Sequence, residues 1–152
     1  MKNLYLLSTD KPSKLVKIYN DVNKETFTLK LNVEVNDSFK EYVNVYITSD
    51  EEIKDGEWHL HYYEGKPVIS KSYNGAVKVI NEIAEQFSYK KVILTTDADL
   101  INDGVQEIPD EFLEWFVKNP NCNFVRAIKV PYFDESSYSY VLIIPIEEDF
   151  ED

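Results

Sequence analysis

The sequence predicts an α+β fold: a compact single domain, mostly an antiparallel sheet, with one or two short helices. Three observations favour this class. Alternating apolar and polar residues recur along the chain, whereas helical spacing is confined to two short stretches. Eleven Tyr and eight Phe stand against four Gly, which is typical of strands around an aromatic core. A length of 152 residues suits one domain with one core.

Strand patterns dominate the order of elements. Thr26–Val35 alternates so that Phe27, Leu29, Leu31, Val33 and Val35 share one face. Glu64, Gly65 and Lys66 form the turn of a predicted hairpin. The predicted strands are Leu4–Leu7, Thr26–Val35, Tyr42–Thr48, Glu57–Tyr63, Pro67–Lys71, a strand beginning at Lys91, Phe124–Val130 and Tyr138–Ile144. The last of these is apolar enough to predict a central strand.

Two helices are predicted. Ala76–Phe87 has apolar residues at helical spacing, although Ala76–Ile80 also suits a strand. Pro109–Lys118 is clearer, because proline and two carboxylates suit a first helical turn and Asn119-Pro120 suits its end. Its predicted core stripe is Phe112, Leu113, Phe116 and Val117. Glu111, Glu114 and Lys118 are predicted to face water.

Charge divides the chain into a body and a tail. The net charge is −12, and five carboxylates without a cation lie in Glu147–Asp152. We therefore expect a single acidic domain over residues 1–146 and a solubilising acidic tail over residues 147–152. Arg126 is the single arginine and the lysines are scattered. Direct binding to nucleic acid or to an anionic membrane is therefore disfavoured.

The most one-sided segment is Val92–Val117, which contains no Lys or Arg. It reads as a strand, an acidic turn and then the second helix. Such a segment is either a solvated face or a surface for a basic partner. The candidate partner-binding residues are Asp97, Asp99, Asp103, Glu107, Glu111 and Glu114.

Candidate metal and catalytic sites are weak. The acidic residues from Asp97 to Gly104 do not fit the spacing of a calcium loop in either register. His59 and His61 share a strand face, but only the distant Cys122 offers a third ligand, so two solvent-facing imidazoles are expected. We assign no catalytic, cofactor-binding or metal residue and no cofactor. A small metal-dependent or carboxylate-based enzyme stays open as an alternative.

Compartment signals are consistent with one another. Cys122 is the single cysteine, so no disulfide within the chain is possible and a reducing environment is expected. The apolar run near Met1 is too short for a signal peptide, and no apolar run reaches the ~18 residues of a membrane span. The sequence predicts a cytoplasmic protein, in the cytosol of whichever cell makes it.

Four segments, Met1–Ser13, Tyr46–Trp58, Lys91–Asp97 and Ile108–Pro120, resemble a family of small uncharacterised phage and prophage proteins of Bacteroidetes such as flavobacteria. The resemblance implies a non-enzymatic protein that inhibits host defence by protein–protein contact. Its sharpest form is an anti-CRISPR protein on an RNA-guided nuclease, with a type VI RNA-guided RNase as one target. The alternative is an accessory phage protein whose charge serves solubility. The family supplies no catalytic residues.

Overall fold

The computed structural model describes residues 2–32, 40–71, 79–82, 89–131 and 137–145. They form an α+β fold in which strands predominate, as the sequence predicts. Its elements are β1 (Leu4–Ser8), β2 (Leu15–Tyr19), β3 (Phe27–Leu31), β4 (Lys40–Ser49), β5 (Trp58–Tyr63), β6 (Lys66–Lys71), β7 (Lys90–Thr95), α2 (Ala98–Asn102), β8 (Gln106–Glu107), α3 (Asp110–Phe116), β9 (Arg126–Pro131) and β10 (Tyr138–Ile143). Residues 79–82 are also helical.

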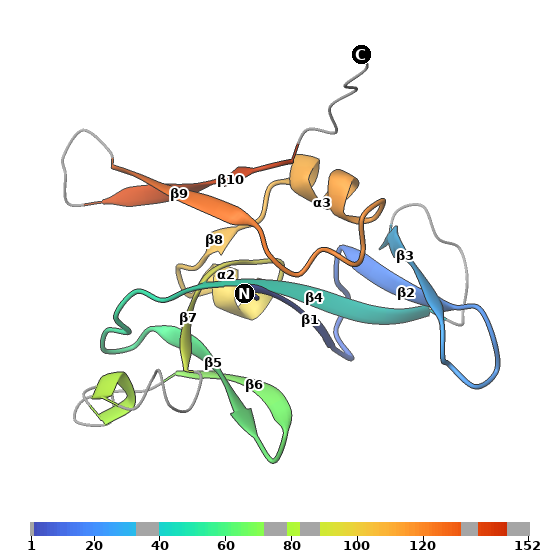
Figure 1. The fold of residues 1–152 in the computed structure, drawn as a ribbon, viewed down its shortest axis with the longest axis horizontal. Coiled ribbons are helices and arrows are strands. Elements are labelled where there is room, and N and C mark those ends of the chain that lie inside the picture. Colours follow the sequence, from blue (N-terminus) through green and yellow to red (C-terminus); the bar gives the residue numbers. More distant parts are fainter. Residues whose placement is uncertain (1, 33–39, 72–78, 83–88, 132–136, 146–152) are drawn as a thin grey trace.

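Strand β4 is the centre of the main sheet (Figure 1). Along one edge it pairs with β1, from Ile47 to Val43. Its other edge is shared by two strands in succession: β7 pairs with residues 46–49 and β2 with residues 40–43. All three pairings are antiparallel. Asn44 therefore lies at the point where β7 leaves the edge of β4 and β2 begins.

The remaining strands extend this centre outwards. β3 pairs with β2, and the β5–β6 hairpin adds to β7, both antiparallel. β8 is short and pairs with β7 in parallel. β9 and β10 form a separate two-stranded antiparallel ribbon. Figure 1 shows the ribbon and α3 on the same side of the main sheet.

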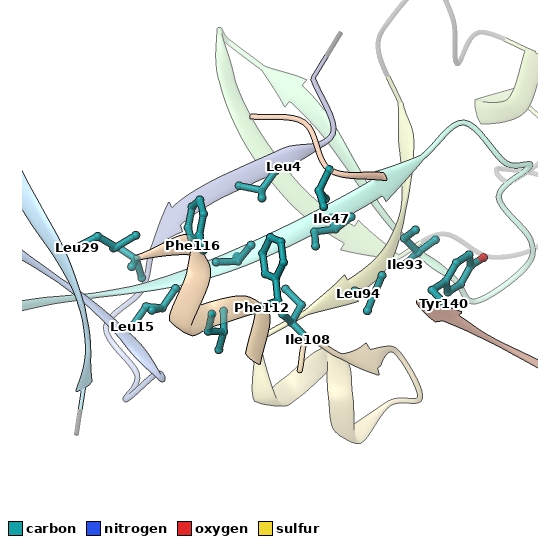
Figure 2. Close-up of a cluster of buried hydrophobic side chains, with 14 residues drawn as sticks. Leu4, Leu15, Leu29, Ile47, Ile93, Leu94, Ile108, Phe112, Phe116 and Tyr140 are labelled. Atoms are coloured by element: carbon teal, nitrogen blue, oxygen red, sulfur yellow. The ribbon is translucent and has the colours of Figure 1, made fainter. Parts of the chain in front are cut away.

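Helix α3 seals the larger core against the sheet (Figure 2). Phe112 and Phe116 are both 1% exposed, and their rings stack 6.0 Å apart. They belong to one cluster with apolar side chains of β1, β2, β3, β4, β7, the ribbon and the residue before it: Leu4, Leu15, Leu29, Val43, Val45, Ile47, Ile93, Leu94, Val125 and Tyr140. The predicted core stripe of this helix is confirmed, and Glu111, Glu114 and Lys118 are exposed.

A second cluster gathers residues from β1, β4, β5, β7 and α2: Tyr5, Tyr46, Leu60, Val92 and Leu100. Residues 45 and 46 of β4 belong to different clusters. This is the alternation that a strand covered on both faces requires. Within the described ranges, no helix reaches the length and apolar character needed to cross a bilayer.

The strand expectations need three corrections. Tyr138–Ile144 is not central, because β10 belongs to the ribbon, where Tyr140 is buried but Val141 and Ile143 are 47% and 39% exposed. Thr26–Val35 is described only to residue 32, and Phe27 is 38% exposed at the outer end of β3. Strand β2 was absent from the prediction, since its five residues carry no complete alternating pattern.

The helix expectations also change in detail. The acidic turn after β7 contains the short helix α2. Pro109 is the N-cap of α3 and does not lie within its first turn. Of the predicted helix Ala76–Phe87, residues 79–82 are helical and the remainder lies outside the described residues. The tail of residues 147–152 also lies outside them.

Substitutions on the buried and exposed faces of α3 should differ in their effect on the free energy of unfolding. Phe116→Ala should lower the free energy of unfolding by roughly 3–5 kcal/mol, because it leaves a cavity beneath a fully buried ring. Glu111→Ala, on the exposed face, should change it by less than roughly 0.5 kcal/mol. Urea unfolding followed by circular dichroism measures both. Equal losses would show that the described packing face is wrong.

Candidate functional site

A groove of about 580 Å³ opens near the point along β4 where its pairing with β7 ends and its pairing with β2 begins. Its walls come from the segment before β2, the end of β3, α2, β8 and α3. The lining residues are Pro12, Ser13, Lys14, Leu31, Asn32, Thr96, Ala98, Ile101, Asn102, Glu107, Asp110, Leu113 and Glu114. The groove therefore combines apolar patches with three carboxylates and one ammonium group.

A buried hydrogen-bond network holds the floor of the groove. Asn44 is 6% exposed, and its Oδ1 accepts a hydrogen bond of 2.9 Å from the Thr96 hydroxyl. Thr96 Oγ1 in turn accepts from the Val45 amide at 2.9 Å. Ser13 Oγ lies 2.7 Å from both Asn44 Oδ1 and the Val43 carbonyl oxygen. These side chains satisfy polar groups that the change of strands would otherwise leave buried without partners.

Lys14 bridges two carboxylates at the mouth of the groove. Its Nζ lies 2.7 Å from Glu107 and 2.8 Å from Asp110. The hydrogen bonds to Asp110 and Glu107 raise the pKa of the Lys14 ammonium. The Lys14 side chain is 42% exposed, so solvent screens the attraction and the pair adds little to stability. The contact shows that the two carboxylates lie close enough together to bind one ammonium group between them.

Asp97 has a structural part in the fold. It is the N-cap of α2, where its Oδ1 accepts a 3.0 Å hydrogen bond from the Asp99 amide. Its Oδ2 accepts from the Tyr46 hydroxyl at 2.6 Å. Burial and this hydrogen bond raise the pKa of Tyr46 far above its ordinary value. Replacing Asp97 would therefore disturb α2 and the second core cluster as well as the surface charge.

Asp99 and Asp103 are compensated by distant lysines. Lys11 lies 2.6 Å from Asp99, and both side chains are mostly exposed. Lys71 and the Trp58 indole both donate to Asp103. The hydrogen bonds from Lys71 and Trp58 lower the pKa of Asp103. The segment Val92–Val117 lacks cations in sequence, yet lysines from other parts of the chain neutralise part of its charge.

Glu111 and Glu114 differ from the other candidates. Both are exposed on α3, and neither has an ion pair within the part of the chain that the structure describes. Glu114 lines the groove together with Glu107 and Asp110, whereas Asp97, Asp99, Asp103 and Glu111 do not line it. The structure thus brings two of the six predicted partner residues to the groove. Sequence reasoning had not included Ser13, Lys14, Asn44 and Asp110, which meet there only in the folded chain.

The histidine pair is not solvent-facing as predicted. His59 is 1% exposed and His61 is half-buried, because the β5 face that carries them lies beneath Tyr89. The ring centroids of the two histidines are 5.3 Å apart, and Tyr89 stacks on His61 at 4.8 Å. Burial and the neighbouring His61 lower the pKa of His59 to about 4. Among the described residues, no three His, Cys, Asp or Glu side chains are grouped to hold a metal ion.

Comparison of the chain with protein-family models, with curated proteins and with solved structures gave no match. The resemblance to phage proteins in the sequence analysis therefore stays a prediction. What can be assigned to the groove rests on its geometry and charge.

The buried histidine predicts a pH-dependent stability. The pKa of His59 falls from 6.5 to about 4 in the folded chain, so the unfolded chain binds the extra proton. Its contribution to stability is full above pH 6.5, is lost as the pH falls towards 4, and is on the order of 3 kcal/mol. The wild-type protein should therefore lose more unfolding free energy between pH 7 and pH 4 than the His59→Gln variant does.

Urea unfolding at several pH values within this window measures the difference. The half-buried His61, whose pKa burial also lowers, provides the matched comparison. His61→Gln should change the pH dependence less than His59→Gln does. Identical pH profiles for wild type and His59→Gln would contradict the burial of a neutral imidazole.

Proposed function

We propose that this protein acts by binding, without chemistry, a protein partner that presents Lys or Arg side chains. The contact surface would be the groove together with the exposed carboxylates of α3. One observation carries the proposal: Glu107 and Asp110 hold the Lys14 ammonium at 2.7 and 2.8 Å. A partner cation of the same chemistry would meet Glu114 on the groove wall and Glu111 beside it.

The negative charge of the protein should raise the rate of association with a basic partner more than it raises the affinity. A chain of net charge −12 attracts a basic surface over a distance, which raises the association rate. The apolar side chains of Leu31, Ile101 and Leu113 line the same groove and offer area for a partner to bury. Charge would thus guide the approach, and apolar contact would slow dissociation.

The resemblance to phage proteins extends the proposal to a class of partner. We propose a host defence complex, most sharply an RNA-guided nuclease such as a type VI RNA-guided RNase. Such nucleases hold their nucleic acid in positively charged channels, to which an acidic protein surface is complementary. The protein would act as an inhibitor by occupying or flanking that channel.

Charge reversal on α3 tests the contact surface. The double variant Glu111→Lys, Glu114→Lys should weaken partner binding by at least about tenfold, since two attractive contacts become repulsive. The fold should survive because both side chains are exposed. The matched control is Glu25→Lys, Glu52→Lys, which changes the net charge equally at exposed positions that do not line the groove.

The measurement needs a partner, found by pulldown from a flavobacterial host and with a panel of purified RNA-guided nucleases at low salt. If both double variants lost the same binding affinity, α3 would contribute only through the net charge of the protein and not through direct contact. Failure to capture any partner at low salt would leave the solubility role as the better account. Turnover in a broad substrate screen would favour an enzyme.

Lys14 allows a test in the opposite direction. If a partner cation takes the place of Lys14 between Glu107 and Asp110, removing Lys14 should strengthen binding. We expect Lys14→Gln to lower the dissociation constant several-fold, whereas Lys66→Gln, an equal charge change on the β5–β6 hairpin, should have a smaller effect. Surface plasmon resonance with the captured partner measures both. Weaker binding by Lys14→Gln would mean that Lys14 itself contacts the partner.

A further inference from the structure

A second pocket gathers positive charge on this acidic protein. It has a volume of about 250 Å³ and lies between the amino-terminal residues, the end of β4, the start of β7 and strand β9. Lys2, Lys90, Arg126 and Lys129 line it, against the carboxylates of Asp50 and Glu51. Four cations and two carboxylates give it a local charge of +2, although the chain as a whole carries −12. It shares no residue with the groove.

One of the carboxylates is already neutralised within the pocket. Both oxygens of Glu51 accept from the Tyr140 hydroxyl, at 3.0 and 2.8 Å, and Lys129 lies 3.1 Å from Glu51. Burial opposes ionisation of Glu51, but the hydrogen bonds from Tyr140 and Lys129 hold its pKa below the ordinary value. The charges of Lys129 and Glu51 thus compensate each other. Asp50 is then the one carboxylate of the pocket lining that remains to offset the charges of Lys2, Lys90 and Arg126.

The remaining cations are available to a ligand. Within the described ranges, neither Lys2 nor Arg126 has an ion pair. Lys2 Nζ lies over the Tyr5 ring, 4.7 Å from its centroid, and Lys90 Nζ is 3.2 Å from the Lys2 carbonyl oxygen, so neither ammonium is neutralised by a carboxylate. Their backbones are fixed, since Asn3 exchanges two hydrogen bonds, of 2.7 and 2.8 Å, with the backbone of Val125. The segments that carry Lys2 and Arg126 are therefore held together by hydrogen bonds between the Asn3 side chain and the Val125 backbone, and no shared anion is needed.

Apolar and uncharged polar residues complete the lining of the pocket. Ile93 and Val125 are 4% and 2% exposed, and Phe124 beside them is 43% exposed. An exposed phenyl ring next to an arginine suits a ligand with an anionic group and an attached apolar or aromatic portion. Arginine favours phosphate and carboxylate because its guanidinium group donates two parallel hydrogen bonds.

From this arrangement we infer that the pocket binds a small phosphomonoester. The phosphate group meets Arg126, Lys2 and Lys90, and the organic portion lies against Phe124. The charge selects this class, because a phosphomonoester carries about −1.5 to −2 at pH 7 and the pocket carries +2. The site is independent of the proposed groove function, so either can fail alone.

Titration with phenyl phosphate tests the inference on the full-length chain. Amide shifts in two-dimensional NMR should saturate and should be confined to residues around the pocket. Benzenesulfonate, a monoanion with the same ring, should bind several-fold more weakly at the same ionic strength. Lowering the pH through the second phosphate pKa, about 6, should weaken phenyl phosphate binding. Equal affinity for the two ligands, or shifts that do not saturate, would overturn the assignment.

Two exposed cations provide the variants. Arg126→Gln and Lys2→Gln should each raise the dissociation constant of phenyl phosphate, Arg126→Gln by about tenfold or more. Lys30→Gln, an equal charge change on β3 at a position that does not line the pocket, should leave it unchanged. The NMR spectrum of each variant confirms its fold. Unaltered binding by both pocket variants would place the ligand elsewhere.

Discussion

Strand β4 is mostly buried and ten residues long, so the backbone N–H and C=O groups along both of its edges need hydrogen-bond partners. The arrangement of the other strands follows from this requirement. One edge is filled by β1 and the other by β7 and then β2. A single neighbour could have filled the second edge, but two short strands leave a junction at Asn44. The side chains of Ser13, Asn44 and Thr96 close that junction, and the groove opens above it.

Charge in this molecule is arranged by folding more than by sequence. Lysines at positions 11, 14 and 71 come from outside the acidic segment and meet its carboxylates. Among the described residues, Asp97, Glu111 and Glu114 of this segment have no ion pair, and Glu111 and Glu114 are the two of them on the exposed face of α3. The cations that take no part in this compensation include those near β9, where the local charge is positive. An acidic composition therefore conceals two surfaces of opposite character.

The local patterns of the sequence predicted local structure well. Periodicity within one short segment predicted α3 and its buried rings, and the turn residues Glu64–Lys66 predicted the β5–β6 hairpin. The errors arose where a residue's environment depends on distant segments. Tyr138–Ile144 is apolar, but only its packing decides that alternate side chains stay half-exposed in a ribbon. His59 is buried because Tyr89 covers it, and Lys14 meets Glu107 across 93 positions of sequence. No periodic pattern encodes such contacts.

The hydrogen bonds between Asn3 and Val125 join residues 122 positions apart. They attach the first strand to the segment that leads into β9, which also supplies Val125 to the core around α3. During synthesis, β1, β4 and β7 emerge long before this attachment can form. Contacts of such long range make folding slow, because the closure of a long loop precedes the gain in packing. The newly made chain would thus hold its sheet with one face of the core incompletely covered until residues near 125 arrive, which is when it is most exposed to aggregation.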